Sequence, residues 1–142
     1  METLYTGRGT TIAGRAGHTG TDDGKISFDL SPPGSSGAGT NPEQLFACGY
    51  SACFGSAIEA VMKKKQMDIG EIKVSADVSL HQDKNGFFLS VILDAAVQGL
   101  EDSTAKGIVL AAHQVCPYSK ATRGNIDVTL KANGQLIEAV SL

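Results

Sequence analysis

The sequence predicts a single α+β domain, and three observations support this assignment. The chain has 142 residues, of which 42% are apolar, and this is enough for one hydrophobic core. A long apolar stretch at residues 41–65 has the composition of a helix and follows a capping signal. Segments with strand character lie on both sides of this helix, and we expect the strands to pair antiparallel.

The expected elements follow one another with short connections. Residues 72–80 alternate strictly between apolar and polar side chains, which is typical of a strand with one buried face. Residues 87–97 form an apolar run after the turn sequence DKNG, and such a run indicates burial on both faces. Asn133-Gly134 predicts a type I′ turn in the last hairpin. The full order is strands at 3–12 and 25–30, a helix at 41–65, strands at 72–80 and 87–97, helices at 102–115 and 118–124, and strands at 126–132 and 135–140, with loops at 13–24 and 31–39.

Two capping signals compete at the start of the first helix. Thr40 with Glu43 matches a capping box, and Asn41 with Pro42 offers the alternative cap with proline at the first helical position. The helix is apolar on most faces and would span about 36 Å at 1.5 Å per residue. We therefore expect the sheet to wrap this helix, and a second subunit to complete its cover in a homodimer.

Composition excludes several classes of protein. The net charge is −3 with a pI near 5.5, and no basic cluster carries interleaved aromatic residues, so nucleic acid is not an expected partner. No uninterrupted apolar run approaches the roughly 18 residues of a membrane span, and the first residues lack a signal-peptide pattern. We expect a cytoplasmic protein without a membrane partner. In that reducing compartment, three cysteines indicate filler, metal ligands or redox-active thiols rather than a disulfide scaffold.

The cysteines leave several interpretations open. Cys53 in the middle of the first helix is either a buried small hydrophobe or a reactive thiol. Cys116 lies in VCPY, where a helix meets a proline, and this break favours a side chain that faces a cleft. If a reversible disulfide forms, the spacing allows Cys53–Cys116 first and Cys48–Cys116 second. Cys48 and Cys53 cannot bridge within one helix, because five residues separate them by about 7.5 Å of rise.

The sequence gives little support for metal binding, phosphate binding or serine-hydrolase chemistry. No CxxC accompanies His113-x-x-Cys116, so we expect no metal site, and we expect His113 to contact the carbonyls that end its helix. The chain lacks a phosphate-binding glycine motif and the G-x-S-x-G of serine hydrolases. Arg15 stands between glycines in AGRAG, a context that lets the backbone approach a ligand closely and aim the side chain.

Three sequence blocks carry a family resemblance. They are GRAG at 14–17, TNPEQLFACGYSACF at 40–54 and HQVCPYSKATRGNIDV at 113–128. In order and spacing they resemble the signature blocks of the organic hydroperoxide resistance (Ohr) family of the OsmC/Ohr superfamily. The resemblance implies an intertwined homodimer with two central helices wrapped by antiparallel sheets, and active sites at the subunit interface. It also implies a thiol-dependent peroxidase that reduces organic hydroperoxides, including those of fatty acids, to alcohols.

The same resemblance assigns roles by position. Cys53 matches the peroxidatic cysteine and Cys116 the resolving cysteine, while Arg15 matches the arginine that activates the thiolate. Glu43 matches the glutamate that holds this arginine, and a bidentate pair would give it that role. The implied cycle forms a Cys53 sulfenic acid and then a Cys53–Cys116 disulfide. An external dithiol, a dihydrolipoyl group on a partner protein, reduces this disulfide, and no cofactor is bound.

Three further expectations complete this assignment. Glu43 and Cys53 lie about 15 Å apart along an unbroken helix, so sharing one Arg15 requires a break near Gly49 or two subunits. We expect Cys48 to be core filler. Bulky substrates need an apolar pocket near the reactive thiol, for which the candidates are Phe46, Tyr50, Phe54, Phe87 and Phe88. The alternatives are an OsmC-type peroxidase and a dimeric redox switch or ligand-binding module without enzyme activity.

Overall fold

The computed structural model describes residues 1–138. The chain divides into two compact units, Met1–Leu45 and Phe46–Leu142. Each unit has its own sheet, one of three strands and one of four. The α+β class is therefore confirmed.

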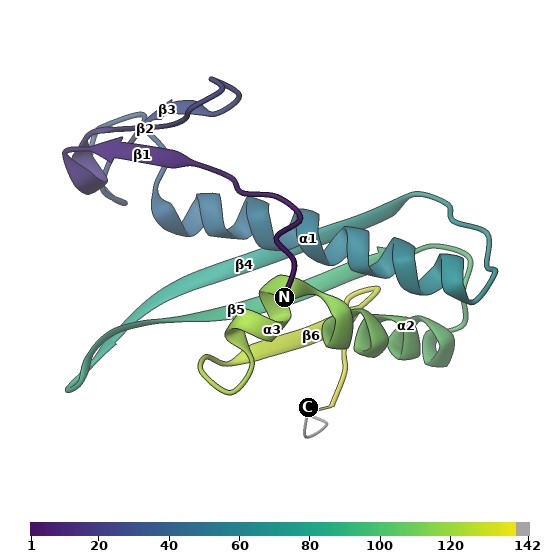
Figure 1. Cartoon of the computed structure of the whole chain (residues 1–142). Helices are drawn as coiled ribbons and strands as arrows, with labels where there is room; N and C mark the ends of the chain where they lie inside the picture. Colours follow the sequence, from purple (N-terminus) through teal and green to yellow (C-terminus); the bar gives the residue numbers. More distant parts are fainter. Residues whose placement is uncertain (139–142) are drawn as a thin grey trace. The chain divides into compact units, whose positions relative to one another are not determined.

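The first unit is a small antiparallel sheet in the order β1-β2-β3 (Figure 1). Its strands are β1 (Gly9–Ile12), β2 (His18–Thr21) and β3 (Ser27–Asp29), with a short 3-10 helix, η1 (Gly14–Ala16), between the first two. The prediction of a strand from residue 3 and a loop throughout 13–24 was wrong, because β2 consists of HTGT and lacks an apolar signal. Gly17 is required at the turn, since a Cβ there would lie 1.7 Å from the carbonyl oxygen of Ile12.

The long helix α1 (Pro42–Lys64) begins in the first unit and continues into the second. Asn41 Oδ1 accepts a hydrogen bond from the Gln44 N–H at 2.9 Å, so the Asn41-Pro42 cap is used rather than the capping box. The helix continues through Gly49 without a break. A Cβ at Gly49 would lie 2.7 Å from the Tyr118 hydroxyl, so the glycine permits close packing against that ring.

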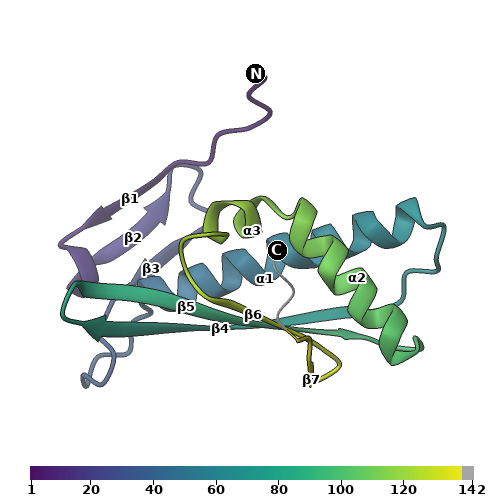
Figure 2. The same cartoon turned by 90° about the horizontal axis from the view of Figure 1, so that it is seen from below.

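The second unit contains a four-stranded sheet in the order β4-β5-β6-β7. Figure 2 shows β4 (Ile72–Asp83) and β5 (Gly86–Val97) as a long hairpin, with β6 (Val128–Ala132) beside β5. β5 and β6 are parallel, so the prediction of purely antiparallel pairing was wrong. The chain between them forms α2 (Asp102–Val115) and α3 (Pro117–Thr122), and such a crossover is what a parallel pair needs.

The last hairpin joins β6 to β7 (Gln135–Leu136). Positive φ angles of 50° at Asn133 and 78° at Gly134 confirm the predicted type I′ turn. β7 is shorter than the predicted strand at 135–140, of which residues 139 and 140 lie outside the described part of the chain.

One hydrophobic core joins α1, α2 and the sheet within the second unit. β5 contributes Val91, Leu93, Ala95 and Val97 from one face, so the prediction of burial on both faces was wrong. α1 contributes one face as well, from Tyr50 to Met62, and the described residues leave its other faces partly exposed. By length and composition alone α1 could cross a membrane, but this is weak evidence because core helices share these properties.

Candidate active site

Two cysteine side chains meet in the second unit. Cys53 comes from α1, and Cys116 lies at the junction of α2 and α3. The Cys116 thiol donates a hydrogen bond to the Cys53 sulfur at 3.5 Å. Both thiols are free, and their contact allows a disulfide bond of about 2.05 Å to form once one sulfur has been oxidised and the two atoms approach further.

The break between α2 and α3 positions Cys116. Its φ of −67° and ψ of 123° are extended, so the residue ends α2 and precedes α3. Pro117 explains this conformation, because a proline disfavours the helical region for the residue before it. The Cys116 side chain is completely buried, whereas Cys53 is half-buried and packs against the same core.

The surroundings of Cys53 act on its pKa in both directions. Burial is the largest effect and raises the pKa, because an apolar site disfavours the thiolate. A backbone hydrogen bond from the Tyr118 N–H lowers it, and the neighbouring Cys116 raises it further. Within this chain the pKa of Cys53 is raised overall, so an efficient nucleophile needs an additional positive charge nearby.

A buried polar cluster lies beside the two cysteines. The Tyr50 hydroxyl lies 2.8 Å from Ser119 Oγ and 3.1 Å from Thr122 Oγ1. Ser119 Oγ is also 2.8 Å from His113 Nδ1. We name these four residues, Tyr50, His113, Ser119 and Thr122, the hydroxyl network.

Most of the hydroxyl network is not predicted by the sequence. His113 was expected to contact terminal carbonyls, but it is buried and bonds Ser119, while the Arg123 guanidinium donates to the His113 carbonyl oxygen. Ser119 and Thr122 lie three residues apart, which places both on one face of α3. That spacing was the only available signal, and it did not identify Tyr50 as the partner.

Arg15 and Glu43 form a bidentate ion pair in the first unit. Arg15 Nη1 donates to Glu43 Oε2 at 2.9 Å, and Nη2 donates to Oε1 at 2.6 Å. The Arg15 hydrogen bond lowers the pKa of Glu43, so the glutamate is ionised at neutral pH. The predicted pairing of these two residues is confirmed. The Arg15 side chain is 45% exposed, so its charge remains accessible.

The five predicted pocket residues occupy different environments. Tyr50 and Phe54 are fully buried in the core. Phe46 is half-buried and contacts the Tyr50 and Tyr118 rings edge to face. Phe87 and Phe88 are exposed near the tip of the β4–β5 hairpin, where Phe88 stacks on His81.

The environment of Cys48 differs from the predicted one. It was expected to fill the core, but its side chain is exposed. The helix explains this difference, because five residues rotate Cys48 by about 140° from Cys53 and carry it away from the packed face.

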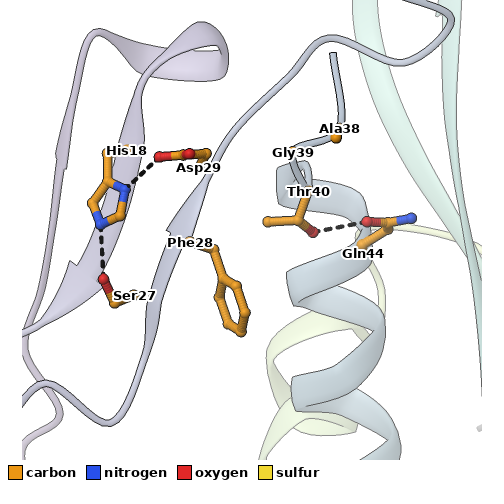
Figure 3. Close-up of a pocket in the computed structure, with 8 residues that line it drawn as sticks. All are labelled: His18, Ser27, Phe28, Asp29, Ala38, Gly39, Thr40 and Gln44. Carbon is orange, nitrogen blue, oxygen red and sulfur yellow. Dashed lines mark hydrogen bonds and ion pairs between the residues drawn. The ribbon is translucent and has the colours of Figure 1, made fainter. Parts of the chain in front are cut away.

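A pocket of about 530 Å³ lies in the first unit, between β3 and the start of α1 (Figure 3). In it, His18 Nδ1 lies 2.8 Å from Asp29 Oδ1 and His18 Nε2 lies 2.9 Å from Ser27 Oγ. This is the connectivity of a Ser-His-Asp triad. However, the Asp29 side chain is 85% exposed, whereas a triad needs an aspartate held in a buried site. We therefore assign it no catalytic role.

Metal binding finds no support in the part of the chain that the structure describes. Within residues 1–138, no group of three or more His, Cys, Asp or Glu side chains lies close enough to hold an ion. The second unit brings together two thiols and the hydroxyl network, and the first unit holds the guanidinium–carboxylate pair.

Comparisons with known proteins show the family of the chain. Residues 34–131 match the family model described as OsmC-like protein. The chain is 46% identical over 133 residues to the organic hydroperoxide resistance protein OhrB of Bacillus subtilis, which covers 90% of this chain and 97% of that protein. It is also 46% identical to the organic hydroperoxide resistance protein of Xanthomonas axonopodis pv. citri, over 89% of this chain and 93% of the relative.

Solved structures show the same fold. The crystal structure of B. subtilis OhrB matches with a TM-score of 0.87 at 45% identity, over 92% of this chain and 99% of that chain. An organic hydroperoxide resistance protein from Vibrio cholerae, solved with captopril in one of its active sites, matches with a TM-score of 0.90 at 46% identity. That match covers 96% of this chain and 97% of the other.

Proposed function

We propose a peroxidase cycle on Cys53 and Cys116. The chain belongs to the OsmC family and to its organic hydroperoxide resistance (Ohr) group. The observation that carries this proposal is the 3.5 Å contact between the two sulfur atoms beside an apolar core. Two thiols in contact, one buried and one partly accessible, suit a reaction in which one is oxidised and the other resolves it.

The first step oxidises Cys53. Its thiolate attacks the terminal oxygen of the hydroperoxide, the O–O bond breaks, and the leaving alkoxide takes a proton to become the alcohol. Cys53 is then a sulfenic acid. The Tyr118 N–H that bonds the Cys53 sulfur supports this step, because a donor to the sulfur favours its charged form.

The second and third steps restore the enzyme. The Cys116 thiol attacks the Cys53 sulfenic sulfur, a disulfide forms, and the hydroxyl leaves as water with the thiol proton. An external dithiol then reduces the disulfide by exchange and becomes a disulfide itself. We propose that a dihydrolipoyl group on a partner protein in the cytoplasm serves as this dithiol.

We propose that the Arg15–Glu43 pair supplies the missing positive charge from a second copy of the chain. Glu43 and Cys53 are ten residues apart in a continuous helix, which is about 15 Å. Both terminal nitrogens of the Arg15 guanidinium bond Glu43, so this guanidinium does not also reach the Cys53 that follows Glu43 in the same helix. The exposed faces of α1 support the same homodimer, because another subunit can cover them.

Apolar hydroperoxides are the proposed substrates. The half-buried Phe46 ring packs edge to face on the Tyr118 ring, and the Tyr118 N–H bonds the Cys53 sulfur, so we take these two rings as the apolar border of the thiol pair. An apolar border favours an alkyl or fatty-acid hydroperoxide over hydrogen peroxide, which gains nothing from burying apolar surface.

Steady-state turnover tests the proposed function. Reduced protein receives cumene hydroperoxide or hydrogen peroxide, with dihydrolipoamide as the reductant. We expect turnover to be faster with cumene hydroperoxide and Cys53→Ser to lower it by about a thousandfold or more. Turnover that survives in Cys53→Ser contradicts the proposal. A Cys53–Cys116 disulfide without turnover would instead favour a redox switch.

A further inference from the structure

The hydroxyl network has no role in the cycle proposed above, yet it connects the two segments that carry the cysteines. Tyr50 and Ser119 are fully buried, and His113 and Thr122 are nearly so. Buried hydroxyl and imidazole groups are costly unless they are hydrogen-bonded, and this network satisfies them mutually. A network of this kind holds its members in one arrangement.

Two of its members each lie about one helical turn from a cysteine. Tyr50 precedes Cys53 by three residues in α1, and Ser119 follows Cys116 by three residues. The Tyr50–Ser119 hydrogen bond is therefore a direct link between the turn that carries Cys53 and the segment that carries Cys116. The Tyr118 ring adds a second contact, with its centroid 5.6 Å from that of Tyr50.

His113 completes this link from the end of α2. Burial is the main effect on its pKa and lowers it, and the nearby positive charge of Arg123 acts in the same direction. The imidazole is therefore neutral at neutral pH and bonds Ser119 without introducing a buried charge. Ser119 is thus held from α1 on one side and from α2 on the other.

We propose that Tyr50, acting through Ser119 and Thr122, is a positioning residue that holds Cys116 against Cys53 for disulfide formation. This inference rests on the proposed peroxidase cycle. Two reactions compete for the Cys53 sulfenic acid. Attack by the Cys116 thiol gives the disulfide and water, whereas a second hydroperoxide oxidises the sulfur to sulfinic acid and is itself reduced to alcohol. Because small displacements of reacting atoms slow a reaction strongly, loss of the link favours the second outcome.

Tyr50→Phe tests this inference, because it removes the hydroxyl and keeps the buried ring. Rapid mixing of reduced protein with cumene hydroperoxide, followed by acid quenching and mass spectrometry, separates sulfenic acid, disulfide and sulfinic acid at Cys53. We expect the first oxidation to stay within about twofold of the unchanged protein and disulfide formation to slow about tenfold. Sulfinic acid should then accumulate at hydroperoxide concentrations that leave the unchanged protein as disulfide.

Two controls distinguish positioning from a general loss of structure. Tyr5→Phe makes the same substitution at an exposed tyrosine and should leave all three rates unchanged. Ser119→Ala removes the other partner of the same bond, so the double variant with Tyr50→Phe should be little slower than either single variant. A general destabilisation would slow both oxidation steps and would make the two effects additive.

The outcomes separate the inference from the proposed function. If Tyr50→Phe and Ser119→Ala form the disulfide at the rate of the unchanged protein, the positioning role is wrong and the peroxidase cycle stands. If the unchanged protein forms neither sulfenic acid nor disulfide at Cys53, the peroxidase cycle itself is wrong.

Discussion

The candidate site residues of the two units differ in how much hydrophobic core surrounds them. In the second unit, the cysteine pair sits against a large core, and Cys116 is completely buried. In the first unit, Leu30 is the one buried hydrophobic residue among those described, while Ile12 and Phe28 are 74% and 52% exposed. The Arg15–Glu43 pair therefore belongs to a unit with almost no core of its own.

This difference indicates which part of the site is complete within one chain. The second unit brings its two thiols together by its own packing and hydrogen bonds. A three-stranded sheet with one buried hydrophobic side chain is marginal alone, and exposed apolar residues on it favour contact with another surface. The charged pair is thus preformed within the first unit, and the exposed apolar residues of that unit agree with the homodimer proposed above.

Arg15→Ala gives the largest effect predicted from this comparison. An opposite charge beside a thiolate lowers its pKa by about 1–3 units, so removal should slow hydroperoxide reduction about a hundredfold at neutral pH. Burial raises the pKa of Cys53, so the variant should react faster as the pH rises toward that pKa. The unchanged protein should reach its plateau at a lower pH. The pH dependence of Cys53 alkylation measures both curves.

Arg8→Ala is the matched control for this experiment, because it removes an exposed arginine from the same unit. It should leave the alkylation profile unchanged. Equal profiles for Arg15→Ala and Arg8→Ala would remove Arg15 from the site and leave the thiol pair without an activating charge.

A second prediction compares the stability of the two units. Phe54 is fully buried, and Phe54→Ala should lower the free energy of unfolding by about 3–5 kcal/mol. Phe28→Ala removes a half-exposed ring and should cost less than about 1 kcal/mol. Denaturant unfolding measures both. A loss at Phe28 as large as that at Phe54 would mean that a partner surface buries the first sheet in solution.

Local sequence signals predicted the helices and the last turn well. The bounds of α2 agree with the predicted helix at 102–115, and Asn133-Gly134 forms the expected turn, because both depend on residues close in sequence. The parallel β5–β6 pair was missed, since pairing direction depends on where a crossover places the returning strand. β2 was missed because its side chains show no apolar alternation.

The site residues also divide into those that the sequence predicts and those that only the fold brings together. Arg15 and Glu43 were predicted as a pair from the family resemblance, and the structure confirms the bidentate geometry. The hydroxyl network was missed because Tyr50 lies about 70 residues before Ser119 and Thr122, and only the fold brings them together. Cys48 was misjudged because an apolar neighbourhood in sequence does not show which face of a helix is packed.

Cys48→Ser should have the smallest effect, and it sharpens the contrast between the two cysteines of α1. Cys48 is exposed, and its position in a continuous helix places it about 7.5 Å along the axis from Cys53, which excludes a bridge between them. Turnover in Cys48→Ser should stay within about twofold, and oxidised protein should still yield the Cys53–Cys116 peptide pair. Peptide mapping that instead finds Cys48 joined to Cys116 would show that the chain rearranges around the thiols on oxidation, because Cys116 contacts Cys53 in the reduced state.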